Sequence, residues 1–146
     1  MAITFSCWIE PTLPDAVDAL LNEALAEGHD WMADMITAWR SAPFIGAGEA
    51  LFLAHAQDML VGTAAISADP FVSESRTGRL RFIYVKAAAR RCGIADQLID
   101  RCLTRGRGRW DRVRLLTENP EAARLYERHG FRPQGGEARM SHCLAL

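Results

Sequence analysis

The sequence predicts an α/β fold in which helices cover a mixed β-sheet. Segments with strand-like and helix-like patterns follow one another in the order β-α-α-β-β-β-α-β-α-β-β, which is typical of layered α/β domains. The chain has 146 residues, of which 49% are apolar and 24% are charged, as in ordinary soluble globular proteins. This length fits a single domain over residues 1–146.

The first part of the chain predicts one strand and two helices. Residues 3–9 are expected to form the first strand. A helix then begins near Thr12, whose hydroxyl is the expected cap, with a proline in its first turn. Asp30 is the expected cap of a second helix, and we expect the tryptophans Trp31 and Trp39 to pack in the core.

The middle of the chain predicts a hairpin, a buried strand and a third helix. Residues 50–56 and 60–67 are short β-leaning runs separated by residues 57–59, which gives a hairpin. Residues 80–85 are largely apolar and are expected to form a buried strand. The apolar residues of 93–105 fall on one helical face, which predicts an amphipathic helix.

The last part predicts a strand, a fourth helix and two further strands. Residues 113–117 form the expected strand. Asn119 and Pro120 mark the start of a helix, because asparagine is a favoured cap and proline suits the first helical position. Gly130 is expected to end this helix. The final strands are expected at residues 131–132 and 139–144.

The loop before the third helix has the features of a phosphate-binding site. Arg90 and Arg91 stand at the entry of the helix, and Gly93 lets a ligand approach the backbone closely. The unpaired N–H groups of a first helical turn and the positive end of the helix dipole favour an anion there. These residues indicate a phosphate or pyrophosphate ligand; the alternative is a tight loop with two surface arginines.

Other kinds of site do not fit the sequence. Lys86 is the only lysine and follows Val85, so there is no Walker A phosphate loop. The four histidines form no HExxH pair, and none lies at a zinc-binding spacing from a cysteine, so we expect no metal site. The arginine-rich run at 105–109 resembles a nucleic-acid patch, but we interpret it as a solvated loop at a helix end and expect no nucleic-acid partner.

The charges divide the chain into two unlike parts. Residues 1–70 carry ten acidic side chains and one arginine, whereas residues 71–146 carry sixteen basic and eight acidic side chains. An acidic part beside a basic part favours a cationic ligand that meets an anionic one. The alternative is an arginine-rich composition with solvated faces, because charge balance constrains solubility more than function.

We expect a cytoplasmic protein without a membrane partner. No apolar stretch approaches the length that spans a bilayer, and the N-terminus lacks the basic and apolar regions of a signal peptide. The four cysteines form no CxxC pair and are expected to be reduced thiols.

Two motifs together resemble those of a known superfamily. Residues 85–95 read V-x-x-x-x-R-x-x-G-x-A, and residues 119–131 read N-x-x-A-x-x-L-Y-x-x-x-G-F. In this order and spacing they resemble the GNAT superfamily of acetyl-CoA-dependent N-acyltransferases. The resemblance implies the GNAT fold, with a mixed, mostly antiparallel central sheet of six to seven strands and about four helices.

The resemblance also implies where acetyl-CoA, the co-substrate, would bind. The backbone of Ile83, Tyr84 and Val85 would hold the thioester and the pantetheine arm. Asn119 would touch the pantetheine, and Tyr126 would lie beside the thioester sulfur. The residues expected to wrap the pyrophosphate are Arg90, Arg91, Cys92, Gly93, Ile94 and Ala95.

The implied mechanism needs neither a metal nor a covalent intermediate. A neutral amine attacks the thioester directly in a ternary complex, and holding the two reactants together supplies most of the gain. The N–H of Ile83 would stabilise the developing oxyanion, and the phenol of Tyr126 can protonate the departing thiolate. The alternative for Tyr126 is a core tyrosine without a catalytic role.

The sequence departs from the family pattern at the position of the base. Arg79 and Arg114 stand where some members of the family carry acidic residues. An ammonium has an ordinary pKa of about 10.4 and must lose a proton before it attacks. Glu118 is the nearest candidate base, and a water chain to the acidic N-terminal part is the alternative. Glu118 could also serve only the dipole of the following helix.

These observations leave three functions to compare. The first is an N-acetyltransferase, either monomer or homodimer, that acts on a small-molecule or peptide amine. The second is a CoA-sensing or interaction domain, motivated by Arg79 and Arg114. The third is a GNAT-fold toxin that acetylates aminoacyl-tRNA, which the acidity of residues 1–70 argues against.

Overall fold

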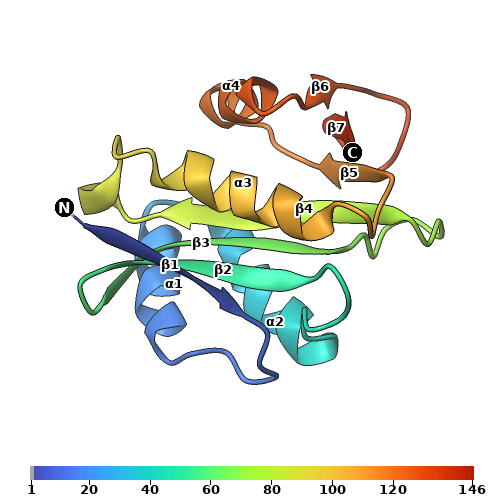
Figure 1. The fold of residues 1–146 in the computed structure, drawn as a ribbon. Helices are drawn as coiled ribbons and strands as arrows, with labels where there is room; N and C mark the ends of the chain where they lie inside the picture. Colours follow the sequence, from blue (N-terminus) through green and yellow to red (C-terminus); the bar gives the residue numbers. More distant parts are fainter. Residues whose placement is uncertain (1) are drawn as a thin grey trace.

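The computed structural model describes residues 2–146 and forms a seven-stranded sheet with helices on both faces (Figure 1). The strand order is β1-β2-β3-β4-β5-β7-β6, and every neighbouring pair is antiparallel except β4 and β5. The strands are β1 (Ile3–Trp8), β2 (Ala50–Ala56), β3 (Met59–Ala68), β4 (Thr77–Val85), β5 (Arg112–Leu115), β6 (Arg132–Pro133) and β7 (His142–Ala145). The helices are α1 (Ala16–Ala26), α2 (Ala33–Ser41), α3 (Ile94–Gly106) and α4 (Pro120–Arg128), with 3-10 turns η1 (Asp30–Met32) and η2 (Ala87–Ala89). The expected mixed, mostly antiparallel sheet with four helices is thereby confirmed.

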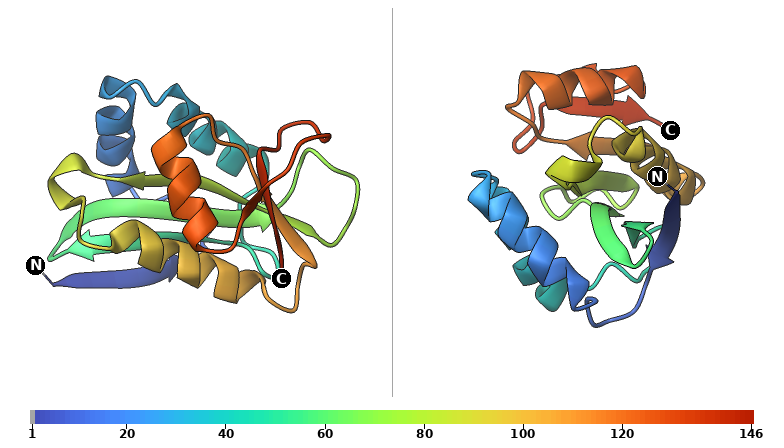
Figure 2. Two further views of the ribbon diagram at one scale, coloured as in Figure 1. Left: turned by 90° about the horizontal axis from the view of Figure 1, so that it is seen from above. Right: turned by 90° about the vertical axis from the view of Figure 1, so that its left-hand side faces the viewer.

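Two hydrophobic cores lie on opposite faces of the sheet. In Figure 2, α1 and α2 cover one face of the sheet. The core between them and the sheet includes Trp39, Phe82 and Tyr84. The other joins α3 to the sheet and is bordered by Leu125 and Tyr126 of α4. Each amphipathic helix therefore buries its apolar stripe against one side of the sheet.

Strand β4 contributes to both cores because its side chains alternate. Phe82 and Tyr84 face α1 and α2, whereas Ile83 and Val85 face α3. A bulge interrupts the ladder to β3 at this point, and Phe82 adopts a φ of 57°. A positive φ in a bulky residue is uncommon, and such strain is concentrated at functional sites.

Strands β4 and β5 separate after a short ladder. They pair only from Thr77 to Arg79 on β4 and from Arg112 to Arg114 on β5. The rest of β4, from Leu80 to Val85, has no strand partner on that side within residues 2–146. The backbone edge that follows the parallel pairs is therefore open to a ligand.

The N-terminal helices differ in detail from the sequence expectation. Helix α1 has Asp15 at its cap position without a side-chain cap bond, so the expected cap at Thr12 is wrong. The first helical bonds run from the N–H groups of Val17 and Asp18 to the carbonyl groups of Pro14 and Asp15, so the helix begins after Thr12. Trp39 is buried as expected, but Trp31 is 44% exposed.

Among the described residues, none of the helices is both long and apolar enough to cross a membrane.

Candidate functional site

A pocket of about 390 Å³ lies where the end of β4, the start of α3 and one face of α4 meet. Six of the residues expected to bind the co-substrate line it: Val85, Arg90, Arg91, Gly93, Ile94 and Ala95. Helix α4 supplies Glu121, Leu125 and Arg128 on the opposite side. The two sequence motifs, separated by more than twenty residues, therefore form one cavity.

The first turn of α3 presents unpaired backbone N–H groups at this pocket. Gly93 occupies the cap position with a φ of 73° and provides no side-chain cap. In the described chain, the N–H groups of Ile94, Ala95 and Asp96 have no hydrogen-bond acceptor. Three unpaired donors at the positive end of a thirteen-residue helix are features that favour an anion.

Two neighbouring arginines of the loop have different surroundings. Arg90 forms a double ion pair with Glu27, the residue that directly follows α1, with N–O distances of 2.5 and 3.0 Å. Its Nε also donates to the carbonyl oxygen of Val85 at 3.0 Å. Arg91 is exposed and has no ion-pair partner among residues 2–146. Arg91 is therefore the cation that is free to meet an anionic ligand.

The side chain of Tyr84 lies on the other face of the sheet, beneath α1. Its hydroxyl lies 2.9 Å from Glu23 Oε2 and also contacts Glu27 Oε1. Glu23 in turn binds Lys86 Nζ at 3.0 Å and accepts the N–H of Ala87 at 3.1 Å. These carboxylates thus tie α1 to both ends of the loop that follows β4.

The electrostatics of this network follow from its contacts. Hydrogen bonds from Arg90 and then Tyr84 lower the pKa of Glu27 to about 2. Burial would raise the pKa of Glu23, but hydrogen bonds from Lys86, Tyr84 and Ala87 outweigh it, so the pKa is lowered. Burial, and then the bond to Glu27, raises the pKa of the Tyr84 phenol. Both carboxylates are therefore charged and weakly basic at neutral pH.

The sequence analysis did not identify Glu23 and Glu27, although their spacing of four residues was a signal. Like charges four residues apart on a helix repel each other and are destabilising unless cations lie between them. The pair therefore implied cations packed on that face of α1. Lys86 and Arg90 are those cations, and they come from a segment about sixty residues further along the chain.

Tyr126, the expected proton donor, lies on α4 and is partly buried. Its ring packs against Phe131 in an edge arrangement, with ring centres 6.1 Å apart. Burial raises the pKa of its phenol to about 12. No hydrogen bond joins its hydroxyl to another residue of the described chain, and it does not line the 390 Å³ pocket.

The remaining predicted residues lie close to the pocket without lining it. Asn119 caps α4 by accepting the N–H of Glu121 at 2.9 Å, which confirms its helix-start role. Glu118 is exposed and has no ion pair in the part of the chain that the structure describes. Cys92 is exposed, and Ile83 faces the core beneath α3.

Arg79 and Arg114 share one buried carboxylate. Asp69, which follows β3, has a fully buried side chain, and its Oδ2 lies 3.3 Å from both guanidinium groups. Its Oδ1 accepts the N–H of Phe71 at 2.8 Å. The two arginines therefore meet an acid that is remote from them in sequence.

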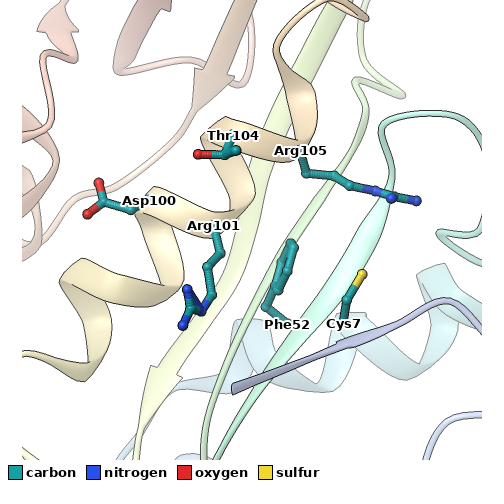
Figure 3. A pocket seen from close by; sticks show the side chains of 6 residues that line it. All are labelled: Cys7, Phe52, Asp100, Arg101, Thr104 and Arg105. Carbon is teal, nitrogen blue, oxygen red and sulfur yellow. The ribbon is translucent and has the colours of Figure 1, made fainter. Parts of the chain in front are cut away.

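Other features of the described chain are less well suited to a site. No group of three metal-binding side chains occurs in residues 2–146. A second hollow of about 390 Å³ lies between β1 and α3, where Figure 3 shows Cys7, Phe52 and Arg101 along its walls. It contains none of the residues singled out by the sequence motifs.

Comparison with known proteins agrees with this geometry. The family model described as Acetyltransferase (GNAT) domain matches residues 47–133, a range that contains the pocket. The chain is similar to a protein from Exiguobacterium sp. 255-15, at 24% identity and a TM-score of 0.84 over 99% of this chain and 94% of that one. It is also similar to a GNAT-family acetyltransferase from Staphylococcus aureus Mu50, at 16% identity and a TM-score of 0.74 over 99% of each chain.

One similar structure contains a ligand. It is a GNAT family acetyltransferase from Elizabethkingia anophelis with acetyl-CoA bound, at 17% identity and a TM-score of 0.65 over 99% of this chain and 98% of that one. At these identities the structural likeness shows a shared fold. No curated protein matches the chain.

Proposed function

Because the chain belongs to the GNAT acetyltransferase domain family, we propose that it transfers an acetyl group from acetyl-CoA to a primary amine. The observation that carries this proposal is the uncapped first turn of α3, which opens into a pocket beside the free edge of β4. A polyanionic ligand with a long polar arm suits that combination, since the helix end binds its phosphates and the strand edge binds its amides.

The residues present fit acetyl-CoA in two respects. The N–H groups of Ile94 and Ala95, with the side chain of Arg91, would hold the pyrophosphate. The segment from Ile83 to Val85 would pair with the pantetheine arm, because β5 does not occupy that edge. Arg90 would contribute mainly through its backbone, since Glu27 holds its side chain. The acetyl-CoA bound to the Elizabethkingia anophelis relative supports this class of ligand.

The reaction needs one bond made, one bond broken and one proton moved. The amine nitrogen forms a bond to the acetyl carbon, and the bond from that carbon to sulfur breaks. The N–H of Ile83, at the bulge of β4, would stabilise the negative charge that develops on the thioester oxygen. The proton lost by the amine finally resides on the thiol of the released coenzyme A.

Tyr126 would assist the departure of the thiolate. Its pKa of about 12 keeps the phenol protonated through the neutral range, so a donor is always present. A thiol has an ordinary pKa of about 8.5, so complete transfer of the phenolic proton is unfavourable at first. We therefore assign Tyr126 a hydrogen bond to the developing thiolate.

The proton of the ammonium must be removed before attack. A water chain that ends on Glu27 would reach a poor base, because the pKa of that carboxylate is about 2. Glu118 has an exposed carboxylate without an ion pair in the described chain. Glu118 is therefore the base we propose.

The test combines binding and turnover. Titration calorimetry with coenzyme A should show saturable binding, and release of free thiol from acetyl-CoA should require an amine from a panel of amino acids, polyamines and peptides. Tight coenzyme A binding with no turnover on any amine would support the sensing domain instead. Salt-sensitive retardation of tRNA, together with its acetylation, would support the toxin. No coenzyme A binding would contradict all three.

A further inference from the structure

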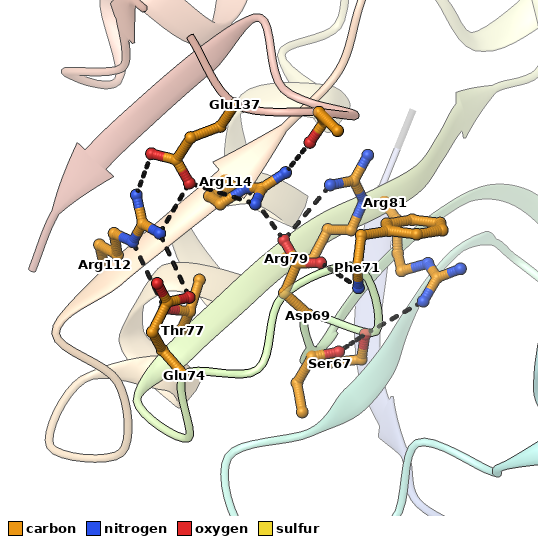
Figure 4. A network of polar contacts seen from close by, with 12 residues as sticks. Ser67, Asp69, Phe71, Glu74, Thr77, Arg79, Arg81, Arg112, Arg114 and Glu137 are labelled. Atoms are coloured by element: carbon orange, nitrogen blue, oxygen red, sulfur yellow. Dashed lines mark hydrogen bonds and ion pairs between the residues drawn. The ribbon is translucent and has the colours of Figure 1, made fainter.

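A cluster of four arginines lies on the α1/α2 side of the sheet, beside the bulge of β4. It consists of Arg79 and Arg81 of β4, Arg114 of β5 and Arg139 of the segment before β7, and we call it the arginine cluster. Figure 4 shows the polar contacts of Arg79, Arg81 and Arg114, with Arg112 and Glu137 at one end.

Positive charge exceeds negative charge in this cluster. Asp69 neutralises part of the charge of Arg79 and Arg114. Glu137 lies 3.4 Å from Arg114 but makes its shorter bonds, of 2.8 and 2.9 Å, to Arg112. Arg81 and Arg139 have no carboxylate within 4.0 Å in the described chain. Two guanidinium groups of the cluster are therefore unpaired.

Arg81 is unusual because it is half-buried as well as unpaired. Its guanidinium lies 4.6 Å from the ring centre of Phe82 and 5.3 Å from that of Phe44, and it reaches only Ser67 Oγ, at 3.4 Å. Burial, and then the charge of Arg79, lowers its pKa to about 10. A partly desolvated cation binds an anion more strongly than a fully hydrated one does.

The nearest other carboxylates do not fill this need. Asp69, and then Asp34 and Glu49, act on Arg81 only through space. Both oxygens of Glu49 already accept backbone N–H groups, from Gly46 at 3.1 Å and from Ala68 at 2.9 Å. Arg81 thus forms no direct ion pair in the described chain, and its guanidinium is available to a ligand.

Two members of the cluster, Arg79 and Arg139, both contact an exposed ring nearby. The ring of Phe71 is 43% exposed and lies between Arg79, at 4.7 Å, and Arg139, at 5.0 Å. Stacking on an aromatic ring holds a guanidinium in a fixed plane. The N–H donors of a guanidinium held in this way form a planar fork that matches a planar carboxylate. Arg139 holds a φ of 60°, so its backbone is also strained at this point.

The position of Arg81 relates the cluster to the reaction. Arg81 directly precedes the bulge at Phe82, and consecutive residues of a strand are only about 3.3 Å apart. The proposed oxyanion donor, the N–H of Ile83, lies on the same bulge. If the amine of the acceptor substrate reaches the bulge from the α1/α2 side, the chemical groups next to that amine therefore lie beside Arg81.

We propose that Arg81, assisted by Arg139, binds a carboxylate of the acceptor, so that the substrate is a free amino acid. This inference rests on the proposed function and defines its substrate class. A polyamine does not fit, because the arginine cluster would repel its additional ammonium groups.

The test compares each amino acid with the amine that remains when its carboxylate is removed, such as alanine with ethylamine and phenylalanine with phenethylamine. We expect kcat/KM, measured by thiol release, to be at least tenfold higher for the amino acid that the enzyme uses than for its decarboxylated amine. In Arg81→Gln this ratio should fall by about 10- to 100-fold, the range expected for a charge-assisted hydrogen bond. Arg139→Gln, at an exposed position, should lower the ratio less and serves as the second variant if Arg81→Gln fails to fold.

The matched control is Arg76→Gln, which removes an exposed arginine that pairs with Asp111 outside the cluster. It should leave the ratio unchanged. Acetylation of amines with no preference for a carboxylate would overturn this inference and leave the proposed function standing. Coenzyme A binding without turnover on any amine would overturn both. Preference for a phosphate-bearing amine such as phosphoethanolamine would replace the carboxylate as the recognised group.

Discussion

At the scale of single residues, the residue type alone does not show which partner a charged side chain binds. Arg90 and Arg91 are adjacent in the sequence and both were expected at the pyrophosphate, but Glu27 holds the first and only the second is free. The sequence could not show this, because the partner of Arg90 lies 63 residues away. Gly93 and Asn119 were predictable, since each acts on its own helix end.

Tyr126→Phe tests the hydrogen bond proposed for the leaving thiolate. We expect kcat to fall by about 100-fold or more, because a positioned hydrogen-bond donor to charge that develops in the transition state contributes at least that factor. Affinity for coenzyme A, measured by calorimetry, should be unchanged, because the phenol does not line the phosphate pocket. Unchanged turnover with intact coenzyme A binding would show that Tyr126 is a core tyrosine only.

At the scale of elements, the patterns predicted the helices and strands better than their junctions. The hairpin β2–β3, strand β4 and helix α3 lie where periodicity placed them, within about three residues at each end. The start of α1 and the exposure of Trp31 did not follow from periodicity, because tertiary contacts decide which turn begins a helix and which face it buries. The link from α1 to the loop after β4 is likewise tertiary.

Glu27→Gln tests that link through its pH dependence. The pKa of Glu27 is lowered from 4.5 to about 2 in the folded chain, so the ion pair with Arg90 stabilises the protein above pH 4.5. This stabilisation is lost as the pH falls toward 2, because protonation removes the charge. The wild-type Tm should therefore exceed that of the variant near neutral pH, and the difference should shrink between pH 4.5 and 2.

The control for this experiment is Glu10→Gln, which changes an exposed glutamate without an ion pair in residues 2–146. Its Tm difference from the wild type should stay small throughout the same pH range. A Tm difference for Glu27→Gln that does not change with pH would contradict the contribution assigned to this ion pair.

At the scale of the whole molecule, the two charged parts of the chain meet inside the fold. The acidic part supplies Glu23, Glu27 and Asp69, and each pairs with basic residues that follow position 76. Part of the asymmetry is therefore used in internal contacts, since three of the ten acidic side chains of residues 1–70 form these pairs. The sequence showed the imbalance but not the pairing, because a net charge contains no distances.

Asp69→Asn tests the most buried of these contacts. Removing the charge leaves Arg79 and Arg114 buried without their shared carboxylate, so we expect the free energy of unfolding to fall by about 3–5 kcal/mol. Urea denaturation measures this change. Asp111→Asn, which removes an exposed ion pair with Arg76, should cost less than about 1 kcal/mol. Similar small losses in both variants would show that the buried pairs contribute little.

The alternation of side chains along β4 has a consequence for divergence among related enzymes. The two reactants would meet at one backbone edge, but the side chains that select each of them lie on opposite sides of the sheet. A mutation at Arg81 or Phe82 changes one side and leaves the main-chain donors and acceptors of that edge intact. Such a strand lets a lineage exchange its acceptor by a few substitutions while it keeps the same acyl donor.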